Sequence, residues 1–124
     1  MEEIKNKDIL KLKSYKFALR IIKLYKYLCE NNNEKVLSKQ ILRSGTSIGA
    51  NVEESIGGQS IKDFRSKILI AYREARETKY WLNLLRDSEI LESKLANSLI
   101  KDCEELIKIS GKIVSTTKTI IENS

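Results

Sequence analysis

The sequence predicts an all-α protein that folds as one antiparallel four-helix bundle, with up-down-up-down connectivity, over residues 1–124. Three observations support this prediction. The length of 124 residues suits one domain, and the chain contains no proline that would kink or break a helix. Apolar residues also recur at spacings of three and four in four segments, at about residues 10–31, 36–56, 60–87 and 92–118.

The first segment has its apolar residues on one helical face. Phe17, Ile21, Leu24 and Leu28 follow one another at intervals of four, three and four residues, which is the repeat of an amphipathic helix. The three asparagines at 31–33 then interrupt the pattern. Such a polar cluster indicates a loop.

The second segment contains RSGTSIGAN, residues 43–51, which by composition suits a loop, a catalytic turn or a helix. The apolar stripe around it keeps helical phase, and Gly45 fills the position in the stripe between Ile41 and Ile48. We therefore predict a helix, although each glycine costs about 1 kcal/mol relative to alanine. Close approach of a neighbouring backbone to Gly45 and Gly49 is the expected compensation. The stripe consists of Leu37, Ile41, Ile48, Val52 and Ile56.

The third and fourth segments carry regular heptad patterns. Ser60 followed by Asp63 resembles a capping box, which places a helix start near residue 60. Spacings of three and four then predict a buried seam in each helix. The seams are Phe64, Ile68, Ala71, Ala75, Thr78, Leu82 and Leu85 in the third, and Leu95, Leu99, Cys103, Leu106, Ser110 and Ile113 in the fourth. The tail at 117–124 is expected to fray.

Polar residues form a row one position behind the apolar stripe of the second helix, and a mixed row lies behind the seam of the third. The first row contains Gln40, Arg43, Ser47, Asn51 and Glu54, and the second contains Ile70, Glu74, Glu77, Trp81 and Leu84. With the turn at 57–59 setting the register, Arg43 should meet Glu74 and Gln40 should meet Glu77. We predict a partly buried polar network, because a charge buried there must be paired. The alternative is a set of exposed, independent side chains.

Positive charge concentrates on the first and third helices. The chain has 23 Lys and Arg against 17 Asp and Glu, a formal net charge of +6, which favours a polyanionic partner such as RNA or DNA. Candidate phosphate contacts are Lys13, Lys16, Arg20, Lys23 and Lys26 in the first helix, and Lys62, Arg65, Arg73 and Arg76 in the third. The alternative is an ordinary solvated face. Leu69, Tyr80 and Trp81 are candidate contacts with another protein chain.

The sequence lacks the residue sets typical of enzymes, cofactor sites and metal sites. Histidine, the commonest general base and metal ligand, is absent, and neither Cys29 nor Cys103 has a C-x-x-C partner. We therefore expect no catalysis, no metal and no cofactor. The charged N-terminus does not resemble a signal peptide, and no apolar run is long enough to span a membrane. A cytoplasmic location with reduced cysteines is the expectation.

The second and third segments resemble a known family. QILRSGTSIGANVEESIGGQSIKDF and AYREARETKYWLNLLRD are similar to the four-helix-bundle proteins encoded in intervening sequences of bacterial 23S ribosomal RNA genes, which are often labelled ribosomal-protein-like. The positions marked by the family pattern hold Gln40, Arg43, Ser47, Asn51 and Glu54. The sequence departs from that pattern at Gly49, where many members have proline, and at Ser55, where they have glycine.

The resemblance implies a bundle that assembles into a homo-oligomeric ring, typically a pentamer. A related branch comprises accessory proteins of diversity-generating retroelements, which resemble basic rings that bind RNA and a reverse transcriptase. Two hypotheses follow for this chain. It is either an oligomeric, non-enzymatic RNA-binding accessory protein whose basic residues contact phosphates, or a protein–protein interaction scaffold whose charge is incidental.

Overall fold

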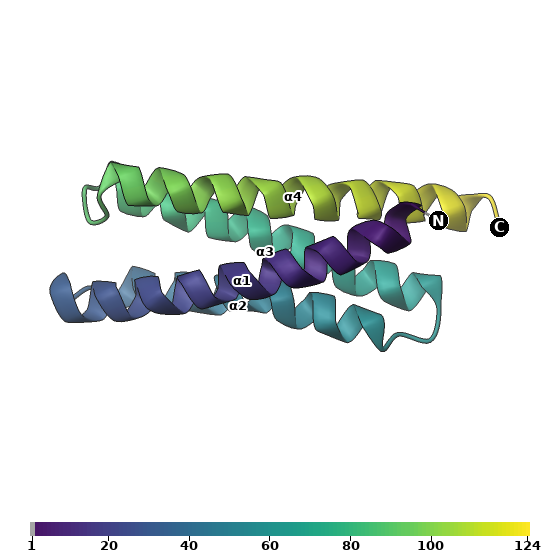
Figure 1. The fold of residues 1–124 in the computed structure, drawn as a ribbon, viewed down its shortest axis with the longest axis horizontal. Coiled ribbons are helices and arrows are strands. Elements are labelled where there is room, and N and C mark those ends of the chain that lie inside the picture. The colour runs from purple at the N-terminus through teal and green to yellow at the C-terminus, as the bar shows by residue number, and fades with distance from the viewer. Residues whose placement is uncertain (1) are drawn as a thin grey trace.

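The computed structural model describes residues 2–124, with side chains from residue 6 onward. It contains four α-helices, α1 (Glu2–Asn31), α2 (Val36–Ile56), α3 (Ile61–Asp87) and α4 (Ser93–Glu122). Consecutive helices run in opposite directions, and the start of α1 lies at the same end of the bundle as the end of α4 (Figure 1). The all-α fold class and the four-helix bundle predicted from the sequence are confirmed.

The helices close into a bundle through contacts between neighbours. α1 packs on α2, α2 on α3 and α3 on α4, and α4 packs back on α1, less extensively than the other pairs do. In Figure 1, α1 crosses the front of the bundle obliquely, from the start of α2 towards the end of α4. One helix therefore leaves part of its surface outside the regular packing.

The buried core follows the predicted heptad positions closely. Phe17, Ile21, Leu24 and Leu28 of α1 are buried, as are the predicted seams of α3 and α4 apart from Phe64 and Leu95. Regular three–four spacing predicts these positions because helical geometry puts them all on one face.

Four positions differ from the predicted core, and one of them, Leu37 in the first turn of α2, is only partly buried. Leu95 is 36% exposed and Ala96 is buried in its place, because the alternation of three and four residues along the buried face of α4 leads from Leu99 back to Ala96. Ile56 is the last residue of α2 and is 38% exposed. Phe64, in the first turn of α3, is only partly buried.

α1 begins eight residues earlier than predicted, at Glu2 rather than about residue 10. The apolar pattern on which the prediction rested is weak before residue 10, but Leu10 is fully buried. The ammonium nitrogen of Lys7 also lies 6.0 Å from the centre of the Phe64 ring. Contacts between helices therefore extend α1 beyond its sequence signal.

The tail also differs from its prediction, since α4 remains helical to Glu122. Thr117 is fully buried and its Oγ1 donates to the carbonyl oxygen of Ile113, 2.7 Å away. Ile120 and Ile121 are partly buried. This burial holds the last turns against the bundle, so only residues 123–124 lie beyond the helix.

Two loops meet at one end of the bundle. The Asn32 side chain donates to the carbonyl oxygen of Ile90 at 2.7 Å, which joins the α1–α2 loop to the α3–α4 loop. Asn33 and Glu89 adopt positive φ angles of 51° and 64°, a left-handed conformation that reverses the chain in few residues. This contact fixes the ends of all four helices relative to one another.

Candidate functional site

The helix from residue 36 to 56 contains the RSGTSIGAN stretch, and its two glycines face α1. A Cβ atom added at Gly45 would lie 2.8 Å from Cγ1 and 2.9 Å from Cγ2 of Ile21. At Gly49 the added atom would lie 3.4 Å from the carbonyl oxygen of Ser14. The expected close approach therefore occurs within the bundle, and it is tighter at Gly45 than at Gly49.

Arg43 joins α2 to α3 through two carboxylates. Its Nη1 donates to Oε2 of Glu74 at 3.1 Å, and its Nη2 donates to Oε2 of Glu77. Nε1 of Trp81 donates to the same oxygen of Glu77 at 2.9 Å. Arg43 is about half exposed while the Glu74 carboxylate is 20% exposed, so the cluster lies at the edge of the core.

Other members of the two polar rows make separate contacts. Nδ2 of Asn51 donates to the carbonyl oxygen and to Oγ of Ser47, at 2.9 and 3.0 Å. Glu54 forms an ion pair with Lys67 of α3 at 3.7 Å. Most of the row therefore bonds within α2 or to a single partner, and only Arg43 connects two acids.

The expected contact between Gln40 and Glu77 is wrong. Gln40 is exposed, and Glu77 instead accepts hydrogen bonds from Arg43 and Trp81. The long guanidinium group of Arg43 reaches both acids of α3, which lie three residues apart on one helical face.

A buried hydroxyl pair lies beneath the Arg43 cluster, and the sequence analysis missed it. Oγ1 of Thr78 lies 2.9 Å from Oγ of Ser44, and both residues are fully buried. The sequence pattern places Thr78 in the apolar seam of α3. Ser44 directly precedes Gly45, which belongs to the apolar stripe of α2. The adjacency of Thr78 and Ser44 depends on the α2–α3 register, which a single-helix pattern does not report.

The nine basic candidates divide into two groups. Three of them contact other residues of the bundle. Lys13 pairs with Glu105, and Nη1 of Arg20 lies 2.6 Å from Oδ2 of Asp102. Nε of Arg65 donates to the carbonyl oxygen of Val114 at 3.3 Å. Exposed candidates are Lys16, Lys23, Lys26, Lys62, Arg73 and Arg76. No acidic partner contacts these six among the described side chains.

α1 carries a second apolar row on the face opposite its core side. Leu12, Tyr15, Leu19 and Ile22 follow at intervals of three, four and three residues and are 56%, 65%, 48% and 37% exposed. Isolated exposed apolar residues are ordinary, whereas a continuous exposed apolar row is less common on a protein surface. We call these four residues the α1 stripe.

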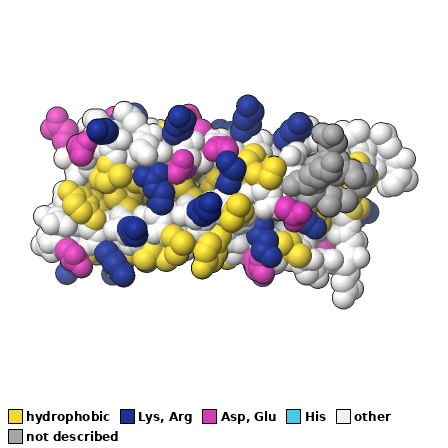
Figure 2. Space-filling view, in the orientation of Figure 1, with side chains coloured by type: hydrophobic (Ala, Val, Ile, Leu, Met, Phe, Trp, Pro, Cys, Tyr) yellow, Lys and Arg dark blue, Asp and Glu magenta, His cyan; other side chains and the backbone are white. Residues whose placement is uncertain are grey.

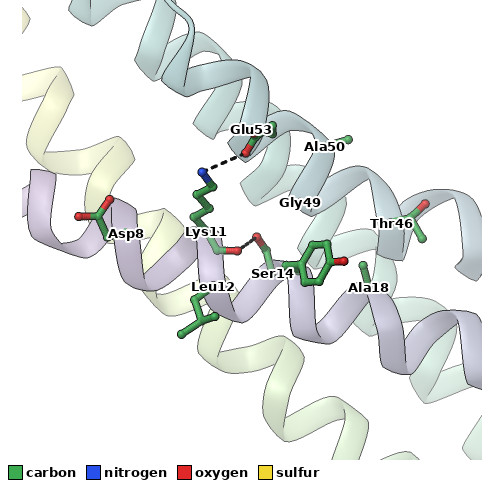
Figure 3. A pocket seen from close by; sticks show the side chains of 10 residues that line it. Asp8, Lys11, Leu12, Ser14, Ala18, Thr46, Gly49, Ala50 and Glu53 are labelled. Atoms are coloured by element: carbon green, nitrogen blue, oxygen red, sulfur yellow. Dashed lines mark hydrogen bonds and ion pairs between the residues drawn. The ribbon is translucent and has the colours of Figure 1, made fainter.

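An open groove of about 650 Å³ runs beside the α1 stripe, between α1 and α2. Leu12 and Ala18 line it from α1, and Gly49 and Ala50 line it from α2 (Figure 3). The ion pair between Lys11 and Glu53, at 3.6 Å, crosses the groove. Small residues on α2 therefore leave the side chains of α1 accessible.

The three proposed interface residues of α3 lie in different environments. Tyr80 is 57% exposed, whereas Leu69 is partly buried. Trp81 packs partly against the core and meets the Tyr80 ring edge-on, with centroids 5.3 Å apart. Of the three, Tyr80 presents the most surface to a partner.

Cys103 is poorly placed to act as a nucleophile. Burial raises the pKa of the Cys103 thiol to about 12, and its Sγ donates to the carbonyl oxygen of Ala75 at 3.1 Å. A protonated, buried thiol is a poor nucleophile. Among the described side chains, no three potential ligands gather to hold a metal ion. None of the described helices has an apolar stretch long enough to cross a bilayer.

Four packed helices with a polar α2–α3 cluster and an exposed apolar α1 stripe define a small four-helix-bundle protein. The chain belongs to the family of 23S rRNA-intervening sequence proteins, whose model matches residues 6–112. The predicted family resemblance is therefore confirmed. A comparison with curated proteins gives no match.

A solved structure supports the same assignment. The chain is similar to a crystal structure from Bacteroides thetaiotaomicron, described as a protein with unknown function from the S23 ribosomal protein family. The two are 45% identical with a TM-score of 0.86, and the match covers 89% of this chain and 98% of the other. The similarity spans essentially the whole bundle.

Proposed function

We propose that this protein is a non-enzymatic, oligomeric accessory protein that binds nucleic acid, with RNA as the favoured ligand. The observation that carries the proposal is the set of exposed basic residues that have no acidic partner among the described side chains, including Lys16, Lys23 and Arg73. Such residues suit phosphate groups, because releasing condensed counterions drives the association. The net charge of +6 and the family membership support the same proposal.

The test is a salt titration of RNA binding. The purified protein would be mixed with fluorescently labelled single-stranded and hairpin RNAs, and anisotropy would give the affinity at 50 and 200 mM salt. Neutralising about six phosphates lowers affinity about 10³-fold over this range. Absence of binding at 50 mM salt, or an affinity that does not change with salt, would contradict the proposal.

A second candidate function is a scaffold for protein–protein interactions in the cytoplasm. The family resemblance implies that such a scaffold is a ring-shaped homo-oligomer. The α1 stripe favours this candidate, because its apolar surface suits protein contacts better than phosphates. Purification distinguishes the two functions. A scaffold without a nucleic-acid ligand emerges free of RNA, whereas an RNA-binding protein retains RNA that absorbs at 260 nm until nuclease treatment and high salt remove it.

A further inference from the structure

A row of lysines on the outward face of α4 is not accounted for by the contacts described above. The row contains lysines at intervals of seven residues, namely Lys94, Lys101 and Lys108, and Lys112 follows one turn further. All four side chains are exposed. Seven residues make two helical turns, so the side chains share one face and recur about every 10.5 Å. The core positions Leu99, Cys103 and Leu106 point the opposite way.

Three acids of α4 form their ion pairs with α1 and α3 rather than with this row, although Glu104 and Glu105 each lie three or four residues from Lys101 and Lys108. Asp102 pairs with Arg20 and Glu105 pairs with Lys13, both on α1. Glu104 pairs with Lys79 of α3 at 2.9 Å. These three acids therefore hold α4 to its neighbours, and none of the described ion pairs involves the four lysines of the row.

α4 lies between the basic residues of α1 and those of α3. α4 packs against both helices, and its ion pairs set their register. The Lys13–Glu105 and Arg20–Asp102 pairs place Lys16 beside the segment between Lys101 and Lys108. In Figure 2, Lys and Arg side chains extend along α4 and over α1 on one face.

On its other side, α4 meets a basic and aromatic part of α3. A groove of about 300 Å³ between the two helices is lined by Arg76, Lys79, Tyr80, Asn83 and Ile107. Tyr80 is exposed, and an exposed aromatic ring beside cations suits the stacking of an unpaired base. Basic residues of three helices therefore adjoin one another, with the α4 row at the centre.

We infer that the outward face of α4 is the central contact surface for a nucleic-acid backbone, with Lys101 and Lys108 as its principal phosphate ligands and Lys16 and Arg76 at its two sides. This inference rests on the proposed nucleic-acid binding, and it assigns the surface of the bundle on which the nucleic acid binds. A row of cations about 27 Å long, from residue 94 to 112, suits an extended line of phosphates. Phosphate contacts along it select for charge and not for base sequence.

The experiment compares two double variants that remove the same charge. Lys101→Gln with Lys108→Gln alters the α4 row, whereas Lys35→Gln with Lys39→Gln alters exposed lysines at the start of α2. Affinity for a single-stranded RNA oligonucleotide is measured across a salt series. Circular dichroism and urea unfolding verify that both variants fold like the parent protein. A single-stranded DNA of the same sequence shows whether the 2′-hydroxyl matters.

The α4 variant is expected to bind about tenfold more weakly, and its log–log salt slope should fall by about 1.4, the loss of two contacts to a single strand. The α2 variant should retain parental affinity and slope. If the two variants behave alike, the α4 inference is overturned while the proposed function stands. If the parent protein binds neither oligonucleotide at low salt, the proposed function fails and the inference fails with it.

Discussion

Gly45 lies where α2 has no room for a side chain. Alanine has a higher intrinsic helix propensity than glycine, by about 1 kcal/mol. A Cβ atom at position 45 would, however, lie 2.8 Å from the buried side chain of Ile21. Ile21 is β-branched, and a β-branched side chain has little rotamer freedom in a helix with which to move aside. The packing cost therefore exceeds the propensity gain at this residue.

Gly45→Ala is expected to destabilise the protein by about 1–2 kcal/mol, because overpacking of a core costs about 1–3 kcal/mol. Gly49→Ala serves as the matched control, since its Cβ would lie 3.4 Å from the nearest atom. We expect that variant to keep or gain up to about 1 kcal/mol. Urea unfolding at one fixed protein concentration measures both values. A Gly45→Ala protein as stable as Gly49→Ala would refute the packing explanation.

The pairing of Arg43 with Glu74 should appear as an energetic coupling. The single variants Arg43→Ala and Glu74→Ala and the double variant define a cycle, with an expected coupling of about 0.5–1 kcal/mol. The ion pair of Lys11 and Glu53 is a control, since both side chains are more than half exposed and 3.6 Å apart. Its coupling should be near zero. Strictly additive effects at Arg43 and Glu74 would show that the pair contributes nothing to stability.

At the scale of the element, α2 begins without a side-chain cap on its N-cap residue, Lys35. Glu34 replaces that cap, because its carboxylate accepts from the backbone N–H groups of Val36, Leu37 and Ser38 at 3.2, 3.0 and 2.7 Å. Burial raises the pKa of Glu34, but these hydrogen bonds outweigh burial and hold the pKa below its ordinary value. The ionised carboxylate therefore stabilises the start of the helix.

Glu34→Ala should destabilise the protein by about 0.5–2 kcal/mol at pH 7, the usual effect of losing a cap. Because the folded-state pKa is lowered, this stabilisation is present above the unfolded-state pKa and is lost as the pH falls through the folded-state pKa. The difference between parent and variant should therefore shrink towards about pH 3. Urea unfolding at both pH values measures it.

Glu92→Ala is the matched control for the Glu34 experiment, since Glu92 is the N-cap of α4 and makes no side-chain cap hydrogen bond. Its effect on stability should be small. A Glu34→Ala difference that stays constant from neutral to acidic pH would contradict the capping role of the carboxylate.

For the whole molecule, the α1 stripe places a continuous apolar surface on the outside of the bundle. Its four residues cannot reach the core, because the opposite face of α1 already supplies Leu10, Phe17 and Ile21 to it. An exposed row of this kind favours association of copies of the chain.

We propose that copies of the chain associate through the α1 stripe, and Leu19→Glu should then give a monomer, because a charge placed in an apolar interface must be desolvated. Light scattering coupled to size-exclusion chromatography measures the mass. Val36→Glu is the control, since Val36 is 74% exposed at the start of α2 and outside the stripe. A Leu19→Glu protein with the mass of an oligomeric parent would exclude the stripe as the interface, and a monomeric parent would refute assembly itself.

Most of the helical architecture follows from local patterns in the sequence. Helical phase through Gly45, the loop at residues 31–33 and the seam from Ile68 to Leu85 are local signals, since residues three and four apart share a face in any α-helix. The same periodicity predicted which residues form the core. It also brought Arg43 opposite Glu74, because a short turn leaves little freedom in the α2–α3 register.

Which charges remain available for a ligand depends on how the helices pack against one another. Lys13 and Arg20 looked equivalent to Lys16 and Lys23 in the sequence, but the α1–α4 packing gives the first two acidic partners. The seven-residue spacing of Lys94, Lys101 and Lys108 can be read from the sequence. The sequence does not mark these lysines as a basic surface, because the same segment also contains Asp102, Glu104 and Glu105. Ion pairing depends on the register and crossing of separate helices, which no periodicity within one helix can specify.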